Sequence, residues 1–381
     1  MNSEFIYLDN NATTPLDPRV LEEMMPYLTD LYGNASSGHR MGKAIKVAVD
    51  KAREEVGNLI NSNPEDIVFT AGATEAVNIA LRGIPNLGIQ KSKHVITVST
   101  EHPAVLDTCN YLESIGVSVT YLNVNSEGLI DLEELRDAIT PNTVLISIMF
   151  VNNETGVTQP IKQISEIAQE YGVLFMSDAT QAVGKCPVDV IDYNIDILTF
   201  SAHKFYGPKG IGGLYVNPRL KLNPLVYGGG HERGLRSGTL NVPGIMGTGA
   251  AARYAEQGMD KDSQYIGKLA TKLQQELLSL ENTSLNGSSD KRLYNTVNIC
   301  FEGADNEALL LNLKNICVSN GSACSSLTMK PSHVLLAMGL DRVRANSSIR
   351  FSLGRFNKEE EIDRTLVEVK TSINRLKIMN V

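Results

Sequence analysis

A carboxylate and an amine each follow an apolar, β-branched run in the segment 173–216. Asp178 comes after the run at 173–176, and Lys204 comes after the run at 195–200. Such runs are typical of buried strands in a parallel sheet, and ligands of open α/β sheets bind beyond the carboxyl ends of the strands. Pyridoxal phosphate uses this pair of groups: a lysine holds it as a Schiff base, and an acidic partner keeps its ring nitrogen protonated.

The alternative is that Asp178 and Lys204 are ordinary loop residues or form a surface ion pair, because short motifs often match by chance. The neighbours of the lysine favour the cofactor. Ser201 and His203 flank Lys204 with hydrogen-bonding groups, and a glycine-rich stretch at 207–213 allows close approach of the backbone. A surface lysine requires none of these features.

Other polar side chains also follow predicted strands and gather at the same edge of the sheet. They are Thr74, His102, Asn153 and Gln181. Gly72 to Thr74 open a predicted helix, whose free N–H groups and positive dipole end suit a phosphate, although an ordinary helix cap has the same sequence. His102 alone would more often be structural than catalytic.

Cys324 is the one cysteine in a segment of small polar residues, GSACSS, which cannot be a packed strand. We therefore expect it on an exposed, mobile loop, where a thiol can react. Cys109, Cys300 and Cys317 lie in apolar or helical surroundings and are predicted to be buried and inert. Cys186 lies in a loop without a comparable setting.

Composition limits the classes of function. At 381 residues the chain exceeds the size of one core, so two domains are expected. A net charge of −8 argues against nucleic acid or a membrane surface as the main partner. No run reaches the roughly 20 apolar residues of a membrane span, and the N-terminus lacks a signal pattern. Five cysteines without metal spacing indicate a reducing cytoplasm and no metal site.

Strands and helices alternate over most of the chain, which predicts an α/β fold with a doubly wound, mostly parallel sheet. The expected strands are 67–70, 94–99, 118–124, 143–151, 173–176 and 195–200, and the expected helices are 20–28, 45–59, 131–139 and 161–171. A large domain at 16–255 is predicted to bind the cofactor. Helices from about 245 to 280 lead into a smaller α/β domain, 1–15 with 256–381, which has strands at 294–301 and 316–318, a helix from 332, and a C-terminal helix. The glycine-rich basic segment 217–244 is either a loop that reaches a phosphate or a mobile surface loop.

The chain resembles the cysteine desulfurases of the aminotransferase class V family, which use pyridoxal phosphate on the type I fold. The motifs occur in family order and run nearly end to end: LDNNATTPLDPRV, FTAGATEAVN, STEHPAVLDTC, VNNETGV, SDATQAVGK, FSAHKFYGPKGIG, GGGHERGLRSGT, NGSACSS and SSIRFSLGR. The long cysteine loop resembles the subgroup typified by iron–sulfur assembly members. Ala35, Ala202 and Asn320 stand where Pro, Gly and Ser are usual, and none of them removes a reacting group.

The resemblance implies a role for each matching residue. Lys204 forms the Schiff base and takes the Cα proton, Asp178 pairs with the ring nitrogen, and Gln181 binds the ring hydroxyl oxygen. His102 stacks on the ring and moves protons. The phosphate is held by Ala73, Thr74, Ser201 and His203, with Thr239 from the partner subunit of a homodimer. Asn153 and Arg350 bind the carboxylate of L-cysteine.

Cys324 is implied to accept the sulfur as a persulfide, while L-alanine is released and the sulfur passes to an acceptor or scaffold protein. The resemblance also allows Cys324 to ligate a nascent iron–sulfur cluster transiently. The sequence does not distinguish whether the sulfur goes to iron–sulfur clusters, to tRNA thiolation or to DNA sulfur modification. An aminotransferase or kynureninase-like lyase has no use for the loop cysteine. A selenocysteine lyase shares nearly every motif, and a non-catalytic scaffold would not need Lys204, Asp178 and Cys324 together.

Overall fold

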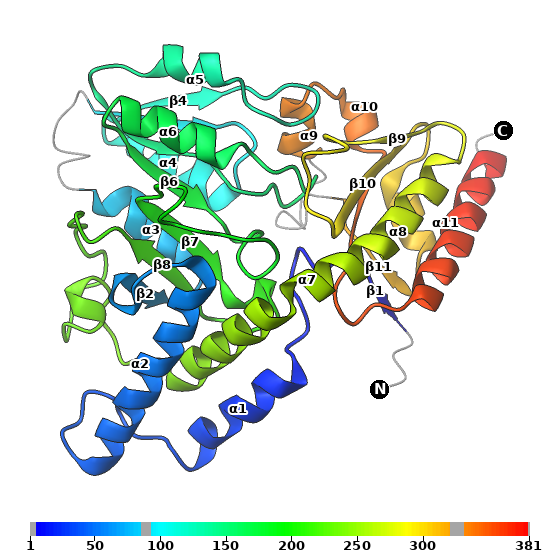
Figure 1. Cartoon of the computed structure of the whole chain (residues 1–381). Helices are drawn as coiled ribbons and strands as arrows, with labels where there is room; N and C mark the ends of the chain where they lie inside the picture. The colour runs from blue at the N-terminus through cyan, green and yellow to red at the C-terminus, as the bar shows by residue number, and fades with distance from the viewer. Residues whose placement is uncertain (1–4, 85–92, 321–330, 380–381) are drawn as a thin grey trace.

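Six of the seven strands in the main sheet run in one direction. The computed structural model describes residues 5–84, 93–320 and 331–379 (Figure 1). The strand order is β2-β8-β7-β6-β5-β3-β4, and only β8 runs opposite to the other strands. The strands are β2 (Ile67–Thr70), β3 (His94–Val98), β4 (Ser118–Leu122), β5 (Thr143–Ser147), β6 (Leu174–Asp178), β7 (Ile197–Ser201) and β8 (Gly212–Val216).

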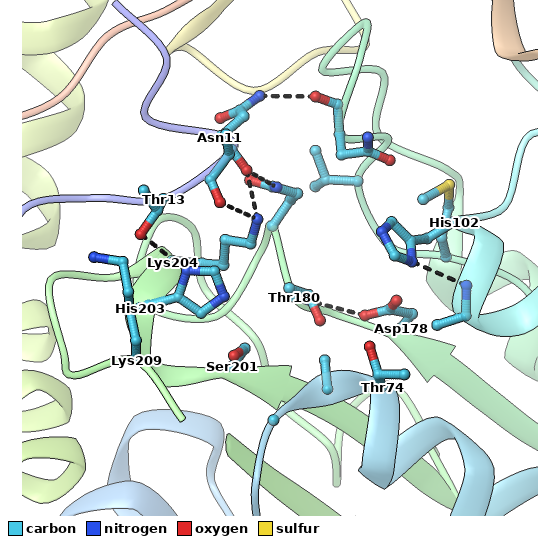
Figure 2. A pocket seen from close by; sticks show the side chains of 18 of the residues that line it. Asn11, Thr13, Thr74, His102, Asp178, Thr180, Ser201, His203, Lys204 and Lys209 are labelled. Atoms are coloured by element: carbon cyan, nitrogen blue, oxygen red, sulfur yellow. Dashed lines mark hydrogen bonds between the residues drawn. The ribbon is translucent and has the colours of Figure 1, made fainter. Parts of the chain in front are cut away.

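Helices cover both faces of this sheet, because alternate strand residues point to opposite sides. On one face, Leu198 and Phe200 share a core cluster with residues of α2 (Arg40–Ile60), α5 (Leu132–Ala138) and α6 (Ile161–Glu170). On the other face, Ile197 and Met176 pack with α3 (Ala73–Gly83) and α4 (Pro103–Ser114). The predicted doubly wound, mostly parallel α/β fold is confirmed. The carboxyl ends of the strands open into the cavity shown in Figure 2.

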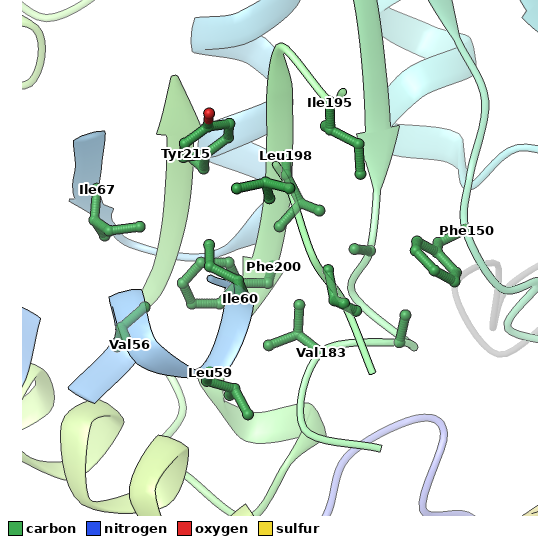
Figure 3. Packing of buried hydrophobic residues seen from close by; sticks show 14 of the residues in the cluster. Val56, Leu59, Ile60, Ile67, Phe150, Val183, Ile195, Leu198, Phe200 and Tyr215 are labelled. Atoms are coloured by element: carbon green, nitrogen blue, oxygen red, sulfur yellow. The ribbon is translucent and has the colours of Figure 1, made fainter. Parts of the chain in front are cut away.

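Phe200 is central to the first of these clusters (Figure 3), where it lies among Ile60, Leu198 and Val183. Its ring lies against β8, and a Cβ on Gly213 would come within 2.1 Å of its Cζ atom. Only glycine leaves room for the ring there. This close packing holds β7, and the lysine that follows it, against β8.

A second core is built around a smaller sheet. β10 (Thr296–Phe301) lies between β9 (Thr283–Leu285) and β12 (Ser348–Ser352), all antiparallel, and β1 (Ile6–Tyr7) pairs in parallel with β11 (Ile316–Cys317). α8 (Asn306–Asn312) and α11 (Glu359–Met379) cover it. α7 (Val242–Leu278) joins the two cores: its residues up to Ala255 belong to the first cluster, and those from Ile266 belong to the second.

Several predicted boundaries are wrong in detail. A single helix, α7, replaces the several helices expected over 245–280. The helix expected over 20–28 begins earlier, at Pro18, as α1 (Pro18–Thr29), since the first helical position needs no N–H donor. β5 ends at Ser147 rather than 151, although Phe150 N still donates to Asp178 O at 2.9 Å. The helix expected from 332 is only α9 (His333–Ala337), with Ser332 as its N-cap; α10 (Arg342–Ala345) follows.

No helix within the described ranges is both long and apolar enough to cross a membrane.

A buried ion pair holds the segment 226–240 against the main sheet. Glu232 accepts from Arg53 of α2 through both oxygens, at 2.6 and 2.8 Å, and also accepts from Phe69 N at 2.7 Å. Glu232 and Arg233 have φ values of 48° and 54°, a left-handed conformation that costs free energy for residues other than glycine. The segment predicted to be a reaching or mobile loop is therefore anchored at Glu232.

Replacing Glu232 with alanine should lower the free energy of unfolding by about 3–5 kcal/mol, because the Arg53 charge would be left buried without its partner. Chemical denaturation measures this change. Asp50→Ala, which removes an exposed ion pair with Lys46 on the same helix, is the matched control and should cost less than about 1 kcal/mol. Equal losses in the two variants would contradict the assigned role of Glu232.

Candidate active site

The carboxyl edge of the main sheet forms one wall of a cavity of about 680 Å³ (Figure 2). Ten residues predicted from the sequence line it: Ala73, Thr74, His102, Asn153, Asp178, Gln181, Ser201, His203, Lys204 and Arg350. Thr239 is exposed and does not line this cavity. Cys324 lies outside the described residues. The structure thus brings together side chains from five strands of the main sheet and from β12.

Lys204 reaches back across the cavity to the N-terminal segment. It ends a single 3₁₀ turn, Ala202–Lys204, directly after β7. Its Nζ atom donates to the backbone oxygens of Asn11 at 2.6 Å and Ala12 at 2.8 Å (Figure 2). These contacts direct the amine into the cavity, where a carbonyl of a ligand could meet it.

Asn11 was not predicted as a site residue, yet it contacts much of the cavity wall. Its backbone oxygen also accepts from Gln181 Nε2 at 2.9 Å, and its side chain donates to Asn153 O at 3.1 Å and Thr296 Oγ1 at 2.8 Å. The motif LDNNATT contains no charged group at this position, so local sequence gives only a turn. Its match to the family was the one signal that could have found it.

Asp178 is the last residue of β6 and is only 6% exposed. Its Oδ1 atom accepts from Thr180 N at 3.0 Å, which fixes the carboxylate at the cavity wall beside His102 (Figure 2). A carboxylate held in this way can accept a hydrogen bond from, or keep a proton on, a basic nitrogen of a ligand.

His102 caps α4 through its ring. Nδ1 accepts from Ala104 N at 3.1 Å, so the proton of the neutral ring lies on Nε2. Burial lowers the pKa of His102, the nearby Asp178 raises it, and Lys204 lowers it again. The ring is therefore neutral near pH 7 and has one N–H group to donate.

Glu101 lies beneath the site and was not predicted from the sequence. It is fully buried, and its Oε1 atom accepts from Met149 N at 2.5 Å, while Oε2 has no hydrogen-bond partner within the described part of the chain. Burial and the charge of Asp178 raise the pKa of Glu101 well above its ordinary value. We infer that this carboxyl is protonated and neutral, so that no second negative charge lies beside Asp178.

The start of α3 lies next to Ser201 and forms a cradle for an anion. A Cβ built on Gly72 would lie 3.7 Å from Ser201 Oγ, and one built on Gly212 would lie 2.8 Å from Gly72 Cα. The two glycines bring the first N–H groups of the helix onto the sheet, where the dipole favours negative charge. His203 bonds to Thr13 Oγ1 at 3.1 Å. Burial and neighbouring lysines lower its pKa to about 4, so it is neutral near pH 7.

Arg350 brings a buried cation from the smaller sheet to the opposite wall. It is 3% exposed, donates to Asn153 O at 2.9 Å, and pairs with Asp9 at 2.6 Å. Its Nε atom has no partner within the described residues. A guanidinium group with a free donor suits a carboxylate.

The residues present fit pyridoxal phosphate. The helix start with Ser201 suits a phosphate, Asp178 suits a ring nitrogen, and Lys204 supplies the amine. Thr180, also in the cavity wall, has a buried hydroxyl without a partner in the described part of the chain, which leaves polar capacity for a bound group. The described residues contain no cluster of three or more histidines, cysteines or acidic residues that could hold a metal ion.

None of the four described cysteines lines the cavity. Cys109 and Cys300 are buried, and Cys186 and Cys317 are partly buried. Burial raises the pKa of each thiol, to about 12 for Cys109 and Cys186. A thiol that stays protonated at neutral pH is a poor nucleophile.

Residues 6–365 match the family described as aminotransferase class-V. The cysteine desulfurase IscS of Photorhabdus laumondii is 49% identical over 377 residues, which cover 98% of this chain and 93% of that protein. A solved structure of a NifS-like protein superposes with a TM-score of 0.91 at 38% identity, covering 98% of this chain and 100% of that one. Another, titled SspA in complex with cysteine, has a TM-score of 0.84 at 40% identity, covering 92% and 99%.

The match spans most of the chain, and the chain therefore belongs to the aminotransferase class V family, with the type I fold of pyridoxal phosphate enzymes. Its relatives share nearly half of its residues over almost their whole length. Its activity is that of a cysteine desulfurase with pyridoxal phosphate as the cofactor. The family, fold class, enzyme class and cofactor predicted from the motifs are confirmed.

The buried Glu101 makes stability depend on pH. A carboxyl whose folded pKa is raised stabilises the fold fully below its unfolded pKa, near 4.5, and loses this contribution as the pH rises through the folded value. Glu101→Gln keeps an oxygen for Met149 N but cannot ionise. The variant should therefore gain stability relative to the wild type between pH 5 and pH 8, measured by denaturant unfolding at both values. A difference that does not change with pH would contradict a neutral Glu101.

Proposed function

We propose that this chain removes sulfur from L-cysteine at the cavity described above, releases L-alanine, and carries the sulfur as a persulfide on Cys324 to an acceptor protein. The observation that supports this proposal best is the arrangement of Lys204, Asp178 and Arg350 around one cavity. These groups match an amine, a ring nitrogen and a carboxylate. We place the reaction in the cytoplasm, a reducing compartment, because the described cysteines are all free thiols.

Different residues of the cavity bind the substrate and move protons. Arg350, with its free Nε donor, and Asn153 hold the substrate carboxylate. Lys204 would hold the cofactor and would take the Cα proton, and the neutral His102 would carry protons near the reacting atoms. Asp178 keeps the ring nitrogen protonated. Pyridoxal phosphate, when bound, supplies an electron sink for the charge that develops at Cα.

The sulfur step needs a nucleophile outside the cavity wall. The Cys324 thiolate attacks the substrate sulfur, the bond between Cβ and sulfur breaks, and its electron pair stays on Cβ, which takes a proton. One thiol and one L-cysteine thus give one persulfide and one L-alanine. The residues on both sides of the segment that carries Cys324 support this assignment, because Ser319 pairs with the backbone of Arg350 and His333 Nε2 lies 2.9 Å from Glu101 O.

Cys324→Ser tests the assignment. The variant should bind pyridoxal phosphate and still change its absorption spectrum when L-cysteine is added, because the thiol is not part of the cofactor site. Persulfide and sulfide formation should fall below detection, because a serine hydroxyl is neither soft nor ionised near neutral pH. Mass spectrometry after incubation with L-cysteine maps the persulfide. Cys317→Ser is the matched control and should keep the activity, and a persulfide on any cysteine other than Cys324 would refute the proposal.

We also propose a homodimer in which Thr239 completes the phosphate site of the partner subunit. Segment 226–240 and α2 line a groove of about 1,000 Å³ that includes Val47, His231 and Leu240. Val47 of this groove is 69% exposed, and Tyr227 of segment 226–240 is 80% exposed. A second copy of the chain would cover them.

Mixed dimers can show whether Thr239 acts in the site of its own subunit or in that of the partner subunit. Thr239→Ala homodimers should bind the cofactor roughly 10- to 100-fold more weakly, the value of a hydrogen bond to a charged group. A heterodimer of Lys204→Ala and Thr239→Ala subunits, purified with two tags, should regain about half of the wild-type activity, because one of its two sites is complete. Activity no higher than that of the Thr239→Ala homodimer would show that Thr239 acts in its own subunit.

The division into domains is part of the same proposal. A large domain of 16–255 and a small domain of 1–15 with 256–381 agree with the change of core cluster along α7 between Ala255 and Ile266.

A further inference from the structure

Lys185 is buried behind the cofactor wall and has no role in the chemistry described above. It follows β6 by a few residues and is only 5% exposed. Its Nζ atom donates to Gln181 Oε1 at 2.6 Å. No carboxylate pairs with Lys185 in the described part of the chain. Its polar contact is therefore the hydrogen bond to the neutral amide of Gln181.

A lysine in such a place needs an explanation, because burying an amine without a counter-ion costs several kcal/mol. Burial, and then the charge of Lys204, lower the pKa of Lys185 to about 7. An apolar residue of similar length, such as methionine, would fill the same space without this cost. A merely structural role therefore accounts poorly for the amine.

Two hydrogen bonds, one from Lys185 and one to Asn11 O, determine which way the amide of Gln181 faces. The protonated Lys185 amine has three donors and no acceptor, so the atom that it meets is the amide oxygen. The amide nitrogen then points away from Lys185, and one of its two N–H groups donates to Asn11 O at 2.9 Å. The second N–H group has no partner within the described residues, and Gln181 lines the cavity.

We propose that Lys185 is a positioning residue for the cofactor. By donating to Gln181 Oε1, it fixes the amide so that Nε2 serves as a donor to the ring oxygen of pyridoxal phosphate. Without Lys185, only the hydrogen bond to Asn11 O would hold the amide in this orientation. This inference rests on the proposed role of Gln181 at the cofactor ring.

A double-mutant cycle on the cofactor-loaded protein tests the proposal. The four proteins are the wild type, Lys185→Met, Gln181→Leu and the double variant. The readouts are the dissociation constant of pyridoxal phosphate and the pH midpoint of its absorption change. Lys185→Met should weaken cofactor binding about 2- to 10-fold, the loss expected for one neutral hydrogen bond, and should shift the midpoint in the same direction as Gln181→Leu. In the Gln181→Leu background, Lys185→Met should cause no further change.

Two further variants complete the design. Lys185→Gln keeps an N–H donor at this buried position and should lie closer to the wild type than Lys185→Met. Lys162→Met removes an exposed lysine that pairs with Asp192 and should change neither readout.

The proposal is overturned if Lys185→Met leaves both readouts unchanged, or if it shifts them equally with and without Gln181. A wild-type protein that binds no pyridoxal phosphate would overturn the proposed function as well. If the wild type binds the cofactor through Lys204 and Lys185→Met behaves like it, only the role of Lys185 fails.

Discussion

The backbone oxygen of Asn11 is the atom on which the site depends. It accepts hydrogen bonds from Lys204 Nζ and from Gln181 Nε2, two residues that follow different strands of the main sheet. The same residue reaches Thr296 of the smaller sheet through its side chain. An N-terminal segment that begins as a strand of the smaller core thus fixes the amine and the amide at the wall of the larger one. Displacing this segment would disturb both groups together.

Burial decides the charge of each group around the cavity. Glu101 and Asp178 are both carboxyls near one wall, and burial and the charge of Asp178 raise the pKa of Glu101, the fully buried one. Among the cations, Arg350 has Asp9 as a counter-ion, whereas Lys185 has only an amide and a lowered pKa. In the proposed function, the carboxylate of Asp178 pairs with a ring nitrogen and the guanidinium of Arg350 binds a substrate carboxylate.

The sequence alone predicted the parts of the site that obey a local rule. Polar residues directly after apolar runs, such as Asp178 and Lys204, meet at one edge because parallel strands end there. Asn11, Glu101 and Lys185 were missed for a different reason. Their roles arise from contacts between distant segments or from complete burial, and neither leaves a pattern in neighbouring residues. Segment 226–240 could be read two ways until the structure placed Glu232 against Arg53.

Arg350 shows how the smaller core takes part in the chemistry. Its strand, β12, pairs with β10 along its length, which fixes the guanidinium at the cavity. The backbone of Arg350 also exchanges hydrogen bonds with Ser319, the residue before Asn320 and the segment that carries Cys324. A shift of β12 would therefore move the proposed carboxylate site and the start of the cysteine segment by the same amount. The proposed carboxylate site and Ser319 are thus coupled through one strand, β12.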